Sequence, residues 1–135
     1  MQDPVNLEVW RRSMDFVIEI HAVTRRLSAR AVPGLANQLR RAAMSIPANI
    51  AEGVGQSSPG LTARHLAIAI GSAFEVETHI ILATRLSPSI GTCESALDEL
   101  RQIRRMLFAL HRHYLTRRGD LPPASQPALP CPLPK

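Results

Sequence analysis

Residues 66–82 read LAIAIGSAFEVETHIIL, and this stretch decides the fold. Projected at 100° per residue, its large apolar side chains point almost all the way round a helix axis, not to one side. A helix of this kind must be covered on several sides. Its large apolar residues are Leu66, Ile68, Ile70, Phe74, Val76, Ile80, Ile81 and Leu82.

Proline, glycine and short polar residues divide the chain around this stretch into four helical segments. Proline is tolerated in a first helical turn, and a preceding Ser, Thr, Asn or Asp can cap the helix. No stretch alternates with a period of two, so the sequence predicts an all-α fold of four helices. The starts are marked by Asp3-Pro4 with Asn6, by Pro33-Gly34, by Ser58-Pro59, and by Ser87-Pro88 with Thr92 and Ser95.

The last segment has the clearest division into an apolar and a charged side. One side carries Leu100, Ile103, Leu107, Leu110 and Tyr114, and no acidic residue lies between Arg101 and Arg118. The charged side is a candidate surface for nucleic-acid phosphates, and a merely solvated helix face is the alternative interpretation. The candidate nucleic-acid-binding residues are Arg101, Arg104, Arg105 and Arg112.

The apolar circumference of the segments predicts self-association. A small four-helix bundle buries one stripe per helix, so further apolar surface must meet another chain or stay exposed. We therefore expect a homo-oligomer. The alternative is an irregular monomer in which residues 66–82 form the central helix.

The composition fits one folded domain and a tail. The chain has 135 residues, of which 45% are hydrophobic and 20% charged, and its formal net charge is +5. Asp120 and Lys135 cancel, so the whole excess lies in residues 1–118, which we expect to form the bundle. Residues 119–135 hold six of the eleven prolines, which predicts a disordered tail.

The sequence predicts a cytoplasmic protein without a membrane span. Cys93 and Cys131 cannot form a disulfide framework, and the N-terminus lacks the pattern of a signal peptide. The ten uncharged residues between Arg64 and Glu75 fall short of the roughly twenty that a spanning helix needs.

Three motifs resemble the bacterial four helix bundle protein family. They are LEVW at 7–10 followed by Met14, RRAAMSIPANIAEG at 40–53, and GSAFEVETHIILA at 71–83. The resemblance runs from about Leu7 to Tyr114, and the proline-rich tail has no counterpart. These proteins were first noticed as reading frames in intervening sequences of large-subunit ribosomal RNA genes.

The resemblance implies an antiparallel, up-and-down four-helix bundle. The family is similar in fold to the accessory variability protein of diversity-generating retroelements, whose five bundles form a ring that binds a reverse transcriptase and nucleic acid. A pentamer is therefore the expected oligomer. No catalytic motif comes with the family, and similar folds host different functions.

Four charged residues are candidates for structural ion pairs. Glu77 projects among apolar residues, and we expect it to meet Arg40 or Arg41 of the second segment, because a buried unpaired carboxylate is costly. Arg41 and Glu52 are too far apart to pair with each other, so each should have a partner elsewhere. Pro47 should kink the second helix.

The remaining motifs give weak signals for chemistry. Glu75 and His79 have a spacing that metal ligands can use, but no helix supplies the Glu-x-x-His of di-iron bundles, so no metal is expected. Gly53-Val-Gly55 follows a helix and not a strand, so Gly53 is expected to be a helix C-cap and not part of a phosphate loop. No nucleophile and base are paired, and we expect neither catalytic residues nor a cofactor.

We therefore predict a non-enzymatic, self-assembling scaffold or interaction protein that binds nucleic acid, preferably RNA, or a nucleic-acid enzyme. The alternative is a small-molecule-binding, metal-binding or catalytic bundle with a polar pocket at Glu52, Glu75, Glu77 and His79. A third interpretation is a selfish reading frame whose product has no partner in its host.

Overall fold

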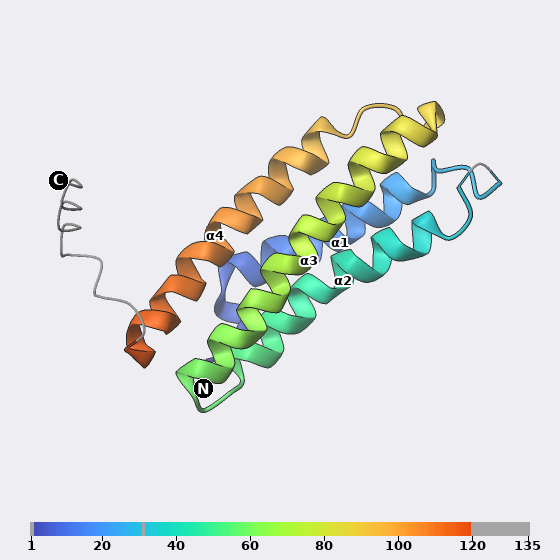
Figure 1. Ribbon diagram of the computed structural model, residues 1–135. Helices are drawn as coiled ribbons and strands as arrows, with labels where there is room; N and C mark the ends of the chain where they lie inside the picture. The colour runs from blue at the N-terminus through green and yellow to red at the C-terminus, as the bar shows by residue number, and fades with distance from the viewer. Residues whose placement is uncertain (1, 31, 120–135) are drawn as a thin grey trace, which may run out of the picture.

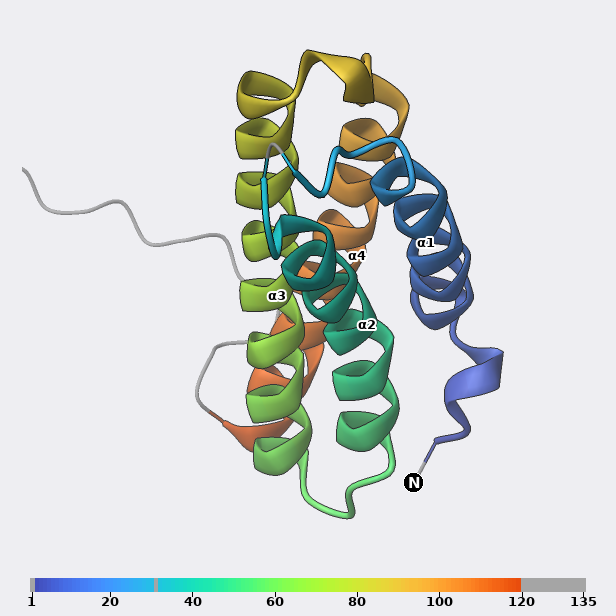
Figure 2. The ribbon, with the colours of Figure 1, turned by 90° about the vertical axis from the view of Figure 1, so that its right-hand side faces the viewer.

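Four long α-helices run alternately up and down, each lying beside the next along the chain (Figure 1). The computed structural model describes residues 2–30 and 32–119, and all regular elements among them are helical. Helix α1 packs against both α2 and α4, which closes the bundle (Figure 2). The predicted all-α four-helix bundle is confirmed. The elements are η1 (Pro4–Asn6), α1 (Glu8–Thr24), α2 (Leu35–Val54), α3 (Pro59–Leu86), η2 (Pro88–Ile90) and α4 (Glu94–Arg118).

The helices begin near the predicted marks but without the predicted side-chain caps. Gly34, with φ of 81°, precedes α2, and Pro59 is at the first position of α3. None of the residues before the four α-helices makes a side-chain capping hydrogen bond. Asp3 caps the short η1 instead, because its Oδ1 accepts from the Val5 amide at 3.0 Å.

Residues from all four α-helices form one hydrophobic core. In α4 the predicted division holds, because Leu100, Ile103 and Leu107 are fully buried while Arg105 and Arg112 are exposed. The largest fully buried side chains are Phe16, Ile20, Leu39, Ile46, Ile50, Leu66, Ile80, Ile90, Leu100, Ile103 and Leu107.

Helices α2 and α3 approach closely at Gly53. A Cβ atom placed on Gly53 would lie 2.9 Å from the His65 Cβ and 3.3 Å from the Thr62 carbonyl oxygen. The predicted C-cap role of Gly53 is wrong, because α2 continues through Val54 and Gly55 is the C-cap. The absence of a side chain at Gly53 is needed for helix packing and not for helix termination.

Pro47 lies inside α2 and is buried, and the helix extends on both sides of it from Leu35 to Val54. A kink at this position stays a prediction. At the other end of the chain, α4 ends at Arg118, and Gly119 follows with φ of 92°. The predicted proline-rich tail lies outside the described residues from position 120 onward.

Helix α3 is the longest helix, and about 42 Å follows from its 28 residues at 1.5 Å per residue. Its length and composition alone would let it cross a membrane, although 44% of its most apolar stretch is buried inside the bundle. Counting only the ten uncharged residues therefore underestimated the length of the apolar stretch in α3. The core helix of a soluble protein meets the same criterion, and the absence of a membrane span stays a prediction.

Candidate functional site

Glu77 on α3 forms a partly buried ionic cluster with α4. Its Oε2 accepts a hydrogen bond from Arg104 Nη1, and its Oε1 lies 3.8 Å from Arg101 Nη2. The side chains of Glu77 and Arg104 are only 19% and 18% exposed. The Arg104 guanidinium also lies 4.4 Å from the centre of the Phe74 ring, where a cation–π contact is favourable. This cluster fixes how α3 and α4 align.

The predicted pairing of Glu77 with Arg40 or Arg41 is wrong. Glu77 lies on the side of α3 that meets α4, whereas the α3 residues that face α2 include His65 and Ser72. Arg40 instead donates from Nε to Thr24 Oγ1 at 2.8 Å, across to α1. Arg41 is exposed.

The four arginines expected to form one basic surface on α4 have different environments. Arg104 is engaged by Glu77 and Phe74, and Arg101 is paired with Asp98 at 3.2 Å as well as with Glu77. Of the four, Arg105 and Arg112 are exposed and form no ion pair within the described part of the chain. The expectation of a single uncompensated arginine face is therefore corrected, because carboxylates from α3 and α4 neutralise half of it.

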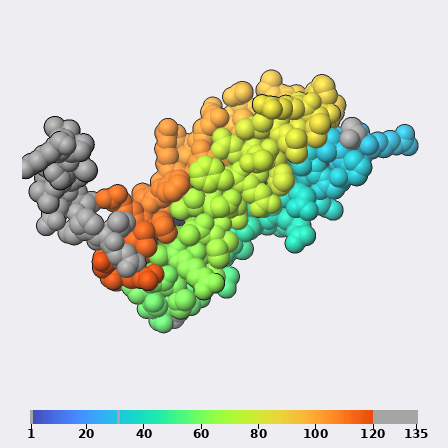
Figure 3. Space-filling view, in the orientation of Figure 1, coloured from blue at the N-terminus to red at the C-terminus, as the bar shows by residue number. Residues whose placement is uncertain are grey.

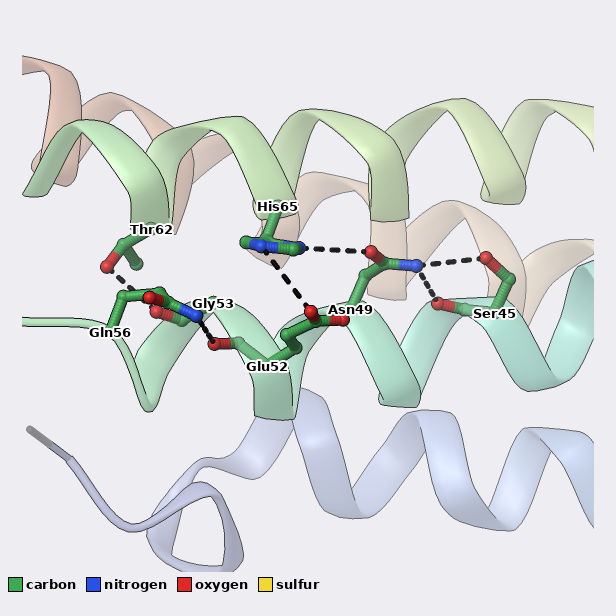
Figure 4. Close-up of polar contacts among 7 residues, drawn as sticks. All are labelled: Ser45, Asn49, Glu52, Gly53, Gln56, Thr62 and His65. Atoms are coloured by element: carbon green, nitrogen blue, oxygen red, sulfur yellow. Dashed lines mark hydrogen bonds and ion pairs between the residues drawn. The ribbon is translucent and has the colours of Figure 1, made fainter. Parts of the chain in front are cut away.

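A chain of polar contacts joins α2 to α3 (Figure 4). Asn49 Nδ2 donates to the Ser45 carbonyl at 2.8 Å and to Ser45 Oγ at 3.0 Å, which leaves Asn49 Oδ1 as an acceptor. His65 Nδ1 lies 3.3 Å from that oxygen and must donate to it. The Ser45 hydroxyl is 2.8 Å from the Ser72 hydroxyl.

The same series of polar contacts gives Glu52 a partner on the neighbouring helix. His65 Nε2 lies 3.8 Å from Glu52 Oε1. Glu52 was expected to have a partner on a neighbouring helix, and the contact is an ion pair when the His65 imidazole is protonated. One turn further on, Thr62 Oγ1 donates to the Gly53 carbonyl at 2.8 Å (Figure 4). His65 bonds an amide oxygen and not a hydroxyl, so these contacts align α2 with α3 and activate no nucleophile.

The sequence did not predict these polar contacts, because they depend on how α2 and α3 are aligned. Asn49 and His65 are sixteen residues apart and meet only when α2 and α3 pack. A signal is present in α2, where Ser45, Asn49 and Glu52 recur at the spacing of one helix face. It does not identify His65 as the residue opposite.

The structure does not bring the four residues of the polar-pocket alternative together. Glu75 and His79 pair on α3 at 3.3 Å, whereas Glu77 turns to α4 and Glu52 faces His65. The His79 Nδ1 atom is buried without a hydrogen-bond partner in the described part of the chain. Within residues 2–30 and 32–119, no group of three or more His, Cys, Asp or Glu side chains is placed to hold a metal ion.

A polar groove of about 850 Å³ lies between α1 and α4. Across it, Arg12 Nε and Nη2 donate to the two carboxylate oxygens of Glu99, both at 2.8 Å. This bidentate hydrogen bonding lowers the pKa of Glu99 and raises that of Arg12. The pair bridges the first and last helices of the bundle.

An apolar surface on the outer side of α3 is left uncovered by the residues that the structure describes. The α3 face consists of Ile68, Phe74, Ile81, Leu82 and Leu86, whose side chains are 40–51% exposed. Phe108 of α4 is 48% exposed and extends the α3 face, since its ring meets the Phe74 ring edge-on at a centroid distance of 6.4 Å. Figure 3 shows α3, in green to yellow, uncovered along the side turned to the viewer.

Most of the chain matches a known protein family. The family model described as the 23S rRNA-intervening sequence protein matches residues 5–109. This range contains α1, α2 and α3 and most of α4, so it includes the α3 face and the polar contacts between α2 and α3. No curated protein matches the chain at a significant level.

Proposed function

The chain belongs to the 23S rRNA-intervening sequence protein family, and from this premise we propose that it is a non-enzymatic scaffold of the cytoplasm. In this proposal several copies associate through the α3 face, and the assembly binds nucleic acid. The expected number of copies is five, from the resemblance described above. The observation that carries the proposal is the exposed α3 face.

The size of the α3 face supports a second copy as its occupant. Burying a large apolar side chain completely is worth about 1.5–3 kcal/mol, so the exposed half of each of these side chains is worth about 1 kcal/mol. With Phe108, the α3 face of one copy contributes about 6 kcal/mol, before the surface of the neighbouring copy that covers it is counted. Association costs about 4–15 kcal/mol, so covering the α3 face with a neighbouring copy offsets a large part of this cost.

The charges on α3 also favour contact with protein. Along the α3 face the charged residues are few, with Glu75 and Arg85 exposed beside it and Glu77 already neutralised by Arg104. A monomeric soluble protein seldom leaves a contiguous apolar surface of this kind uncovered. Self-association removes it from water without leaving an unpaired charge buried.

A pair of matched isoleucine variants tests the proposal. Ile68→Glu places a carboxylate in the α3 face, where Ile68 is 45% exposed, and should shift the chain to monomers at micromolar concentration. Ile18→Glu is the control, because Ile18 is 70% exposed on α1 and lies outside the α3 face. The mass of each variant is measured by light scattering after size-exclusion chromatography.

The proposal requires that Ile68→Glu lowers the mass while Ile18→Glu leaves it unchanged. Equal masses for the wild type, Ile68→Glu and Ile18→Glu would show that the α3 face is not the contact. Circular dichroism of each variant confirms that the helices are intact, so that loss of assembly is separated from loss of the fold.

A further inference from the structure

An apolar groove lies between the start of α1 and the second half of α4. It has a volume of about 400 Å³ and shares no residue with the α3 face. Figure 1 shows the dark blue start of α1 beside the orange half of α4. Glu8 lies at the groove but is 66% exposed, so its carboxylate can stay in water. The rest of the lining consists of Leu7, Val9, Met106, Ala109, Leu110 and His113.

The walls of this groove suit an extended apolar segment. Leu7, Met106 and Leu110 pack against the core but stay partly exposed. The imidazole of His113 meets the Tyr114 ring edge-on, with the ring centres 5.3 Å apart, and so forms an aromatic wall. A methionine side chain adapts its shape to what packs against it. The groove therefore offers adaptable apolar contacts and one flat ring.

The C-terminal sequence of the chain has a matching chemistry. Residues 120–135, which lie outside the described residues, read DLPPASQPALPCPLPK and carry no charge from position 121 to 134. Docking this segment would therefore bury no charged group. In a polyproline helix, with three residues per turn, Pro127 and Pro130 share one edge. Segments of this Pro-x-x-Pro type dock in apolar grooves with aromatic walls.

The connection from the end of α4 is long enough to reach the groove. His113 and Met106 lie six and thirteen positions before Gly119, which is about 9 and 20 Å along the helix axis. An extended chain at about 3.1 Å per residue covers these distances in about three and seven residues. Reversing the direction of the chain takes roughly two to five more. Residues from about 124 to 131 therefore come alongside the groove, and residues 127–130 fall within this window.

We propose that the groove binds residues 127–130 of its own chain. The covalent connection at Gly119 gives this segment an effective concentration in the millimolar range, an advantage that a proline-rich segment of another protein lacks. The prolines also reduce the conformational entropy that is lost on docking. The family model ends at residue 109, so the occupant lies outside the matched range. The proposal depends neither on self-association through the α3 face nor on nucleic-acid binding.

A spin label attached to Cys131 tests the docking directly. The full chain carries Cys93→Ala, so that Cys131 is its only cysteine, and carbon-13 in its methionine methyl groups. Met106 reports on the groove. Met44 on α2 is the reference, because it is 50% exposed and does not line the groove. The intensity of each methyl signal is compared between the oxidised and the reduced label.

The Met106 signal should lose at least about half of its intensity, because a millimolar effective concentration docks about half of the chains even when the dissociation constant is millimolar. The Met44 signal should lose much less. Ala109→Glu places a carboxylate in the groove at an exposed position and should restore the Met106 signal. Ala22→Glu is the matched control, since Ala22 is exposed on α1 outside the groove, and it should leave the loss unchanged.

A second pair of variants changes the segment and not the groove. Leu129→Asp lies within residues 127–130 and should restore the Met106 signal, because docking would then bury a charge. Leu121→Asp introduces the same charge before the window and should leave the loss unchanged. Circular dichroism confirms that each variant keeps its helices.

Dilution separates a segment of the same chain from that of a neighbouring copy. The doubly labelled chain is mixed in urea with a large excess of unlabelled chain and refolded. A loss at Met106 that persists supports docking within one chain, whereas a loss that disappears shows that the segment of another copy fills the groove and contradicts the proposal. Equal losses at Met106 and Met44, or no loss at Met106, would show that the groove does not bind this segment.

Discussion

The close packing of α2 on α3 predicts opposite effects for two glycine-to-alanine substitutions. In Gly53→Ala the new methyl group would lie 2.9 Å from the His65 Cβ. This atom is attached directly to the α3 backbone, so it cannot swing away as the end of a flexible side chain could. The two helices must separate by about 0.5 Å to restore ordinary contact, and overpacking of this kind costs about 1–3 kcal/mol. Separation also stretches the buried hydrogen bond from Thr62 to the Gly53 carbonyl, at a cost of about 0.5–1.5 kcal/mol.

Helix propensity acts in the other direction at Gly53. Alanine is favoured over glycine inside a helix by about 1 kcal/mol. Subtracting this gain from the two costs leaves a net loss of about 0.5–3.5 kcal/mol in the free energy of unfolding for Gly53→Ala. The control is Gly71→Ala in α3, where a Cβ would meet nothing within 4 Å, so propensity alone should raise the stability by about 0.5–1 kcal/mol.

Urea unfolding followed by far-ultraviolet circular dichroism measures both variants. The protein concentration is chosen so that the unfolding midpoint of the wild type does not change on dilution, which keeps association out of the comparison. A Gly53→Ala chain as stable as the wild type, or more stable, would refute the close approach of α2 and α3 at this residue.

Three further predictions concern charged groups and the buried thiol. Glu77→Gln should lower the free energy of unfolding by about 1–3 kcal/mol in urea, because Arg104 loses its carboxylate, and an unchanged midpoint would contradict the ionic cluster. Because the pKa of Glu99 is lowered in the folded state, its stabilisation is present above the ordinary value of 4.5 and is lost as the pH falls through the folded pKa. The stability difference between the wild type and Glu99→Gln should therefore shrink on acidification below pH 4.5, and a difference that grows would be inconsistent with the bidentate pair. Burial raises the pKa of the Cys93 thiol, so in a Cys131→Ser chain a thiol reagent should react at least about tenfold more slowly than with free cysteine until denaturant is added.

The helices and their buried sides could be predicted because both follow from local periodicity. The 3.6-residue repeat in α4 separates Leu100 and Ile103 from Arg105 without knowledge of any other helix. The apolar residues round α3 indicate that the helix is covered on several sides. They do not reveal which of its sides α2 and α4 leave open, because that depends on where the two neighbours pack.

Contacts between helices could not be predicted in the same way. The acidic character of Glu77 requires a basic partner, but whether that partner is Arg40 or Arg104 depends on which neighbour lies opposite. Asn49 and His65 likewise meet only in one alignment of α2 on α3.

The mass of the wild-type chain in solution tests the central claim most directly. Light scattering at micromolar concentration should give a multiple of the 14.8 kDa chain mass, about 74 kDa for five copies. The α3 face would then be covered by other copies, as its exposed phenylalanine, isoleucine and leucine side chains require. A stable particle of 14.8 kDa across the whole concentration range would contradict the account.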